Sequence, residues 1–429
     1  MKATRILVTM MAVAVAMVGF NAFAFHSGGV AECEGCHSMH SPTSASHLLK
    51  GSDDSSTCLN CHDNTTDTAP NGYHISTSDA ARSTANPTGQ LPVQRTPGGD
   101  FGWLKVTYSW VDSGTNVVES GDSHGHNIIA KDFGYTIEQD PDLATSPGGS
   151  FPATQLGCPS CHDPHGKARK LSDGTFAATG APIIASGSYN NSPVPAAGQA
   201  VGVYRILWGA ASPHQPSNTS FTTYPVAIAP STYNRTEAST QTRVAYGGGT
   251  LTNDWGAWCG GCHTSFNTTM KNLKHPIDVA LTAEVVSNYN TYVSSGIMSG
   301  TSATAYLSLV PFAEATEDTF SATALKAHAK TDNSYLNGPS TNDAVTCVSC
   351  HRAHASGFAE MLRFYYSWEF MTYNGNYPGL DNPSMTSSRK SIQASGRNMN
   401  DFQAAYYDRP STFVGPYNRV LCNKCHAQD

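Results

Sequence analysis

Cys158-Pro159-Ser160-Cys161-His162 is one of six copies of the motif Cys-x-x-Cys-His, and these copies decide how the chain folds. The others run from Cys33 to His37, Cys58 to His62, Cys259 to His263, Cys347 to His351 and Cys422 to His426. The 429-residue chain has 12 cysteines, and the six motifs use all of them. A repeat that leaves no cysteine over points to one chemical purpose for the whole set.

The motif spacing is typical of covalent haem attachment. Two thiols three residues apart can each add to one haem vinyl group, and the adjacent imidazole then becomes the proximal iron ligand. We therefore predict six haems c, with thioether bonds to Cys33, Cys36, Cys58, Cys61, Cys158, Cys161, Cys259, Cys262, Cys347, Cys350, Cys422 and Cys425. The predicted proximal ligands are His37, His62, His162, His263, His351 and His426.

Two other uses of paired cysteines are disulfides and zinc. Disulfides are common in secreted proteins, but they would not explain a histidine after every second cysteine. Structural zinc sites need four ligands, which two paired motifs usually supply. Both alternatives explain the pattern less well than haem.

The first 24 residues have the features of a secretory signal peptide. Lys2 and Arg5 precede an apolar run from Ile6 to Phe20, and Ala22-Phe23-Ala24 is a small-x-small cleavage pattern. The run is shorter than the roughly 18 residues of a membrane anchor. We expect one haem-packed unit over residues 25–429, secreted through the periplasm to the cell exterior. Removing Lys2 and Arg5 lowers the formal charge from −7 to −9, so nucleic acid is not an expected partner.

The remaining histidines bear on function, because a second imidazole on each iron leaves no open position for a substrate. Three motifs continue to Cys-x-x-Cys-His-x-x-His, and we call these the extended motifs; the other three are the short motifs. A histidine precedes each extended motif, and another follows two of the short ones by 12 residues. The candidate distal ligands are His26, His40, His74, His126, His165, His275, His328 and His354. Eight candidates exceed six irons, and His47, His124 and His214 lie outside the pattern.

Composition predicts mainly irregular chain with a few short α-helices and minimal β-structure, wrapped around a continuous haem stack. Hydrophobic residues make up only 39% of the chain, and there are 38 glycines and 24 prolines. Such a sequence buries little side-chain core by itself, so haem must fill the interior. We expect helices at 276–293, 322–329 and 398–407, short helices at some motifs, and loops at 96–100, 146–149 and 246–249.

Several long segments resemble the OmcS-type family of six-haem outer-surface cytochromes from metal-reducing bacteria, which polymerise into extracellular filaments. The resemblance covers nearly all of the chain after residue 24. It is carried by residues 25–33, 73–77, 96–103, 125–127, 161–167, 229–247, 352–358 and 421–427. Residues 41–56 look shorter than in the family, and residues 191–222 and 366–397 differ freely.

The resemblance implies six bis-histidine, low-spin haems in a chain that continues through identical subunits. It implies that His40 ligates the haem of Cys347 and Cys350 in the adjacent subunit, and that His354 ligates the haem of Cys33 and Cys36. The implied partners are other outer-membrane multihaem cytochromes, and the acceptors are Fe(III) or Mn(IV) oxides or partner cells. The expected role is electron transfer and not enzymatic catalysis.

Two alternative functions use the same haems. A monomeric periplasmic or surface electron shuttle would have every iron ligated within one chain. A multihaem reductase would need one iron with an open face. Related nitrite reductases have Cys-x-x-Cys-Lys at that haem, and this motif does not occur here.

Overall fold

The computed structural model describes residues 33–44, 46–66, 73–136, 144–209, 224–231, 236–237, 241–248, 255–266, 275–315, 323–413, 419 and 421–427. The candidate signal peptide, His26 and His214 lie outside the described residues. Most of the described chain is irregular, with short helices and small sheets, as the sequence predicts.

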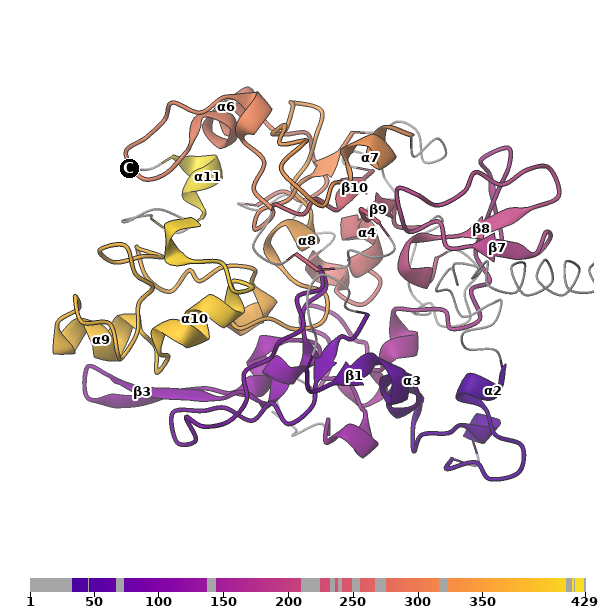
Figure 1. The fold of residues 1–429 in the computed structure, drawn as a ribbon, viewed down its shortest axis with the longest axis horizontal. Helices are drawn as coiled ribbons and strands as arrows, with labels where there is room; N and C mark the ends of the chain where they lie inside the picture. The colour runs from indigo at the N-terminus through magenta and orange to yellow at the C-terminus, as the bar shows by residue number, and fades with distance from the viewer. Residues whose placement is uncertain are drawn as a thin grey trace, which may run out of the picture.

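Every motif begins in or overlaps a short helix, which the sequence led us to expect for some of them. The five α-helices that carry a motif are α2 (Cys33–Cys36), α3 (Asp54–His62), α4 (Trp255–Cys259), α8 (Cys347–Cys350) and α11 (Asn423–His426). The motif that starts at Cys158 lies on the 3-10 helix η7 (Cys158–Ser160). Helix α3 begins where the Asp53 side chain accepts a hydrogen bond from the Ser56 N–H at 2.7 Å, an ordinary N-cap. Figure 1 shows α2 and α11, the first and last motif helices, on opposite sides of the molecule.

Within the described ranges, four further α-helices carry no motif. They are α6 (Ala283–Thr291), α7 (Thr323–His328), α9 (Ser387–Gln393) and α10 (Met399–Ala405). Helices α7 and α10 confirm two of the predicted helices. The third prediction, 276–293, starts too early, because Asp278 and Leu281 donate their backbone N–H groups to residues 345 and 343 and so pair with a neighbouring segment. The helix begins only at the Thr282 N-cap.

Short 3-10 helices fill much of the remaining chain. They are η1 (Ser46–Leu48), η2 (Phe101–Lys105), η3 (Gly121–His124), η4 (Lys131–Phe133), η6 (Ala153–Gln155), η8 (Tyr204–Ile206), η9 (Ser302–Thr304), η10 (Ala359–Met361) and η11 (Ser411–Phe413). Three of them, η1, η8 and η10, contain residues with positive φ.

The described strands form four small sheets. Strands β1 (Asp63–Asn64) and β2 (Ser76–Thr77) are parallel, and β3 (Tyr108–Asp112) and β4 (Thr115–Glu119) form an antiparallel hairpin. The order β6-β5-β8-β7 joins β5 (Arg169–Leu171), β6 (Phe176–Ala177), β7 (Ile183–Ala185) and β8 (Ala200–Gly202). The order β11-β10-β9 joins β9 (Ala227–Ile228), β10 (Ala245–Gly247) and β11 (Ala313–Glu314).

Strand β10 corrects one loop prediction. Residues 246–249 were expected to form a loop because of their glycines. Tyr246 and Gly247 instead belong to β10, because the Tyr246 ring is buried edge-on against Trp255. The predicted turn begins only at Gly248, whose φ is +85°.

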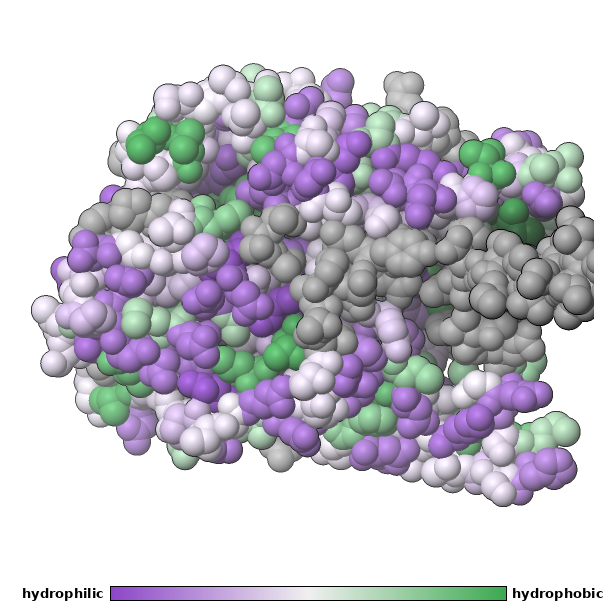
Figure 2. Space-filling model, in the orientation of Figure 1, coloured by the Kyte–Doolittle hydropathy of each residue, from purple (hydrophilic) through white to green (hydrophobic). Residues whose placement is uncertain are grey.

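Side-chain core lies beside the motif helices in separate clusters. The largest contains Trp103, Phe358, Phe402 and Tyr406 and packs the chain near α10. A second contains Trp208, Tyr246, Trp255 and Trp258 and packs around α4. Figure 2 shows small hydrophobic groups scattered over a largely polar surface. Among the described helices, none is long and apolar enough to cross a membrane.

Candidate haem-binding site

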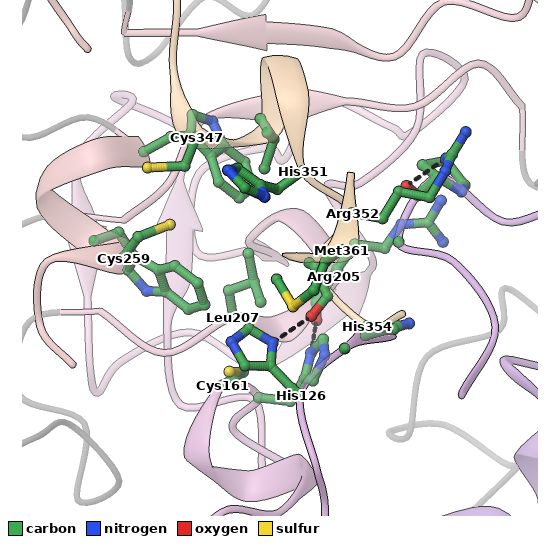
Figure 3. Close-up of a pocket in the computed structure, with 18 of the residues that line it drawn as sticks. His126, Cys161, Arg205, Leu207, Cys259, Cys347, His351, Arg352, His354 and Met361 are labelled. Carbon is green, nitrogen blue, oxygen red and sulfur yellow. Dashed lines mark hydrogen bonds between the residues drawn. The ribbon is translucent and has the colours of Figure 1, made fainter. Parts of the chain in front are cut away.

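One continuous cavity of about 2300 Å³ runs through the described part of the chain. All 12 motif cysteines and all six motif histidines line it. Figure 3 shows its central part, where Cys161, Cys259 and Cys347 come from different elements and border the same space. The motifs, which are far apart in sequence, therefore share one interior.

Consecutive motifs are neighbours along this cavity. The Cys58 and Cys158 thiols are in hydrogen-bonding contact, and so are the thiols of Cys259 and Cys347. At three other junctions, one cysteine has a raised pKa, mainly because it is buried and next because a thiol of the following motif lies near it. These cysteines and their neighbours are Cys36 with Cys61, Cys161 with Cys262, and Cys350 with Cys425. The order of the motifs in the sequence is thus also their order in space.

Four histidine rings stand opposite a motif histidine. The ring centroids are 6.5 Å apart for His37 and His165, 6.3 Å for His162 and His354, 6.1 Å for His263 and His126, and 5.9 Å for His426 and His275. Two metal–nitrogen bonds of about 2 Å, with about 1 Å from each nitrogen to its ring centroid, give a separation of roughly 6 Å. These pairs have the spacing of two axial ligands on one iron.

Five of the motif histidines hold Nδ1 against a backbone carbonyl. The distance from Nδ1 to the carbonyl oxygen is 2.7–2.9 Å. The carbonyls belong to His47, Tyr73, Arg205, Pro147 and Glu360, for His37, His62, His162, His263 and His351 respectively. A carbonyl only accepts, so Nδ1 carries the proton and Nε2 keeps its lone pair for a metal.

Burial keeps two of the opposing imidazoles neutral. It lowers the pKa of His126 to about 4, against a smaller opposing effect of its hydrogen bond to the Ala353 carbonyl. It lowers the pKa of His354 to about 3, with a further contribution from His162. A neutral imidazole is the form that binds a metal.

The position of His354 differs from the ligand assignment that the family resemblance implies. That assignment placed His354 at the first motif, but its ring faces His162 of the third motif, and His165 faces His37. The backbone explains the difference, because the His354 N–H donates to the Gly98 carbonyl at 2.7 Å and Ala355 bridges to Gly99 and Gly125. This backbone pairing holds the segment around His354 and Ala355 next to the third motif.

The other distal candidates lie elsewhere. His74 stacks on Tyr73 at 4.2 Å, and Tyr73 packs edge-on to His62 of the second motif. His40 is exposed, one turn beyond the first motif. His328 binds Glu314 through Nδ1 at 2.5 Å and stacks on Tyr335, so the structure does not place it opposite a motif histidine.

Two histidines outside the sequence pattern have different surroundings. His47 lines the cavity beside the first motif, which the sequence gave no reason to expect. His124 is fully buried, and its ring nitrogens lie 3.0 Å from the Trp103 carbonyl and 2.7 Å from Glu119. His124 is therefore a packing residue.

Buried arginines are the residues that the sequence reasoning missed. Arg352 and Arg363 line the cavity and are almost fully buried around Glu237. Arg352 Nε and Nη2 have no hydrogen-bond partner among the described residues, and Arg363 Nη1 pairs only at 3.5 Å with Glu237. Buried guanidinium groups with unused N–H donors can bind an anionic group in the cavity, and a haem carries two carboxylates. Their only sequence signal is that Arg352 directly follows a motif histidine.

The donor set therefore fits covalently attached haem better than a bare metal ion. Each motif offers two thiols and one oriented imidazole to an apolar cavity, and four offer a second imidazole at axial spacing. Within the described ranges, no group of three His, Cys, Asp or Glu side chains could hold an ion by itself.

Comparison with known proteins agrees with this geometry. No protein-family model matches the chain. The chain is 47% identical to the C-type cytochrome OmcS of Geobacter sulfurreducens over 453 aligned residues, which cover 100% of both chains. Two solved structures from Geobacter sulfurreducens also match. The cryo-EM structure of OmcS nanowires has a TM-score of 0.80, and the outer membrane cytochrome S filament has a TM-score of 0.81. Each match covers 94% of this chain and 100% of the other, at 47% identity. This chain is a c-type cytochrome of the OmcS family.

Proposed function

We propose that the chain carries six haems c and conducts electrons outside the cell as a subunit of a cytochrome filament. The observation that supports this most directly is the single cavity that all six motifs line in sequence order. Carriers bound there would be neighbours at every step, and electron transfer between carriers needs such proximity.

The chain's own residues would hold each haem in a defined way. The two cysteines of each motif would form the thioether bonds, and the motif histidine would be the proximal ligand. His165, His354, His126 and His275 would be the distal ligands at the first, third, fourth and sixth motifs, as their ring positions support. His74 is the nearest candidate for the second motif.

When bound, the haems supply reversible one-electron carriers. The paired imidazoles would occupy both axial positions, which leaves no site for a substrate and favours transport over catalysis. The apolar walls would exclude water from the carriers, and buried Arg352 and Arg363 would offset the negative charge of carboxylates placed beside them.

The fifth motif supports assembly. No ring from the described residues stands opposite His351 as His165 stands opposite His37, while His40 is exposed at the other end of the motif series. His40 would complete the iron of Cys347 and Cys350 in an adjacent subunit. The matching structures of OmcS are of nanowires and filaments, which supports an assembly of subunits.

A secreted filament of this kind would receive electrons from other outer-membrane multihaem cytochromes. It would deliver them to Fe(III) or Mn(IV) oxides or to partner cells. The predicted signal peptide at residues 1–24 supports export through the periplasm.

Electron microscopy of the purified, haem-loaded extracellular protein tests the proposal. We expect filaments from the native chain, six haems per chain by pyridine haemochrome assay, and a low-spin spectrum. His40→Ala should give monomers with one high-spin iron, and His328→Ala, the matched control, should still polymerise. Native monomers with six internally ligated irons would point to a soluble shuttle. Carbon monoxide binding to a native haem would point to a reductase.

A further inference from the structure

Each of the three extended motifs is paired with a short segment that has an unusual backbone. The segments are His47-Leu48, Arg205-Ile206 and Glu360-Met361, with φ values of 58° and 54°, 51° and 48°, and 54° and 59°. Positive φ is uncommon in residues other than glycine and is a clear outlier for a β-branched residue such as Ile206. Surrounding contacts must therefore hold these residues in place.

The contacts are the same at all three sites. The first residue of each pair accepts the Nδ1–H of the proximal histidine through its carbonyl, at 2.7, 2.8 and 2.7 Å. The second accepts the N–H of the residue after that histidine, namely Ser38, Asp163 or Arg352, at 2.8, 2.7 and 2.8 Å. Two residues further on, Lys50, Trp208 or Arg363 donates its N–H to the carbonyl of the second motif cysteine, at 3.0, 3.0 and 2.7 Å.

A leucine completes each unit. Leu49, Leu207 and Leu362 follow the left-handed pairs, and each forms an antiparallel bridge with its proximal histidine. Among the described residues, one other pair of consecutive non-glycine residues has positive φ, Tyr407-Asp408. Its side chains bond elsewhere: the Tyr407 hydroxyl donates to the Thr96 carbonyl, and Asp408 accepts from Arg95. The short motifs differ, since the carbonyls that bind His62 and His263 belong to Tyr73 and Pro147, neither of which has positive φ.

We propose that the three left-handed pairs are latches that aim the second histidine of each extended motif at a different iron. A latch binds both the proximal imidazole and the next backbone N–H. The three residues that follow the proximal histidine, which end in the second histidine, therefore extend from it in a fixed direction. Two sites bear this direction out: His354 of the fifth motif faces His162, and His165 of the third motif faces His37.

The consequence concerns the order of ligation. This inference rests on the proposed haem content and on His40 reaching a neighbour. If both hold, three-residue bridges join the iron of the fifth motif to that of the third, and the iron of the third motif to that of the first. His40 of the first motif then continues the series to the fifth motif of the next subunit. The latches would make each bridge stiff. The short motifs, which lack the second histidine, would stay outside this series.

Two substitutions at Met361 separate backbone direction from side-chain loss. Met361→Val and Met361→Gly both remove the same side chain, but valine disfavours positive φ while glycine tolerates it. Ser113→Val is the matched control, because Ser113 has φ of 50° in the exposed turn between β3 and β4, away from the cavity. The measurements are haem count by pyridine haemochrome and spin state by electron paramagnetic resonance.

We expect six haems in every variant. Met361→Val should convert about one iron in six to high-spin, because His354 no longer reaches the third motif, while Met361→Gly and Ser113→Val should match the native protein. A native spectrum for Met361→Val, or equal defects in both Met361 variants, would overturn the proposal. Fewer than six haems, or high-spin iron in the native chain, would instead count against the proposed function.

A second latch keeps the test decisive if Met361→Val fails to accumulate. Leu48 is 41% exposed, so its replacement disturbs little packing. Leu48→Val should abolish filaments by misdirecting His40, whereas Leu48→Gly should preserve them. Filaments of native length from Leu48→Val would refute the latch at the first motif.

Discussion

His126 and His328 precede two extended motifs in the same sequence pattern, yet they lie in different surroundings. His126 is half-buried and lines the cavity, where its ring faces His263 and its Nδ1 donates to the Ala353 carbonyl at 2.7 Å. His328 is 25% exposed on α7, and its Nδ1 binds the Glu314 carboxylate at 2.5 Å. Arg243 binds the other oxygen of the same carboxylate.

The difference between them is the neighbour that each imidazole meets. The ring of His126 faces a motif imidazole, whereas the ring of His328 stacks on Tyr335. His124 also lies beside a carboxylate, because its ring nitrogens are 3.0 Å from the Trp103 carbonyl and 2.7 Å from Glu119. The comparison teaches that sequence position nominates a histidine as a ligand, but only the fold shows whether its ring faces a motif histidine.

The largest effect should follow from removing a cavity histidine. His126→Ala should leave the iron of the fourth motif with one imidazole, so about one haem in six becomes high-spin. The free energy of unfolding should fall by about 4 kcal/mol, because a ligand is lost and a cavity is made. Absorption spectroscopy and chemical denaturation would check both. An unchanged spectrum would show that His126 is not a ligand and would contradict the contrast with His328.

A somewhat smaller loss should follow from removing a carboxylate that holds a buried histidine. Glu119→Gln would leave His124 and buried Arg397 without their shared anion. We expect the free energy of unfolding at neutral pH to fall by about 3 kcal/mol, with no change in spin state. Glu284→Gln, at an exposed position on α6, is the charge-matched control and should have little effect. A spectral change in Glu119→Gln would contradict the separation of the two regions.

The same carboxylate predicts a pH dependence. Burial opposes ionisation of Glu119, but Arg397 and His124 together lower its pKa from 4.5 to about 2. A lowered pKa stabilises the fold above the ordinary pKa, and this contribution disappears as pH falls through the folded value. Between about pH 4.5 and 2.5, native stability should drop by about 2 kcal/mol more than that of Glu119→Gln. If the free energy of unfolding fell equally with pH in both proteins, Glu119 would not have a lowered pKa.

The smallest effect should come from His328→Ala. The lost ring contacts Tyr335 at 4.1 Å and Glu314, but Arg243 still pairs with that carboxylate. We expect a loss of about 1 kcal/mol and an unchanged low-spin spectrum. High-spin iron in this variant would show that His328 is a ligand after all.

Sequence reasoning reached the fold class because the cysteines alone require haem to fill the interior. It also placed α7 and α10, where apolar spacing and caps are local signals. It could not place the start of α6, because residues 278–281 are held by a segment more than 60 residues away. Local patterns carry no information about such pairing.

The candidate site divides in the same way. The motif spacing nominated the cysteines and histidines that line the cavity, and it also nominated every histidine that the structure places opposite a motif histidine. It could not match them, because His354 reaches the third motif through a backbone bridge to Gly99 and Gly125. It also missed the left-handed pairs, whose carbonyls lie between 9 and 43 residues from the histidines that they bind. Only the leucine that follows each pair is shared.

The contact between thiols of successive motifs has a consequence for biosynthesis. Cys58 touches Cys158, and Cys259 touches Cys347, although each pair belongs to two different motifs. In an oxidising compartment, neighbouring thiols of this kind become disulfides. A chain that folded before maturation would therefore cross-link its own attachment sites.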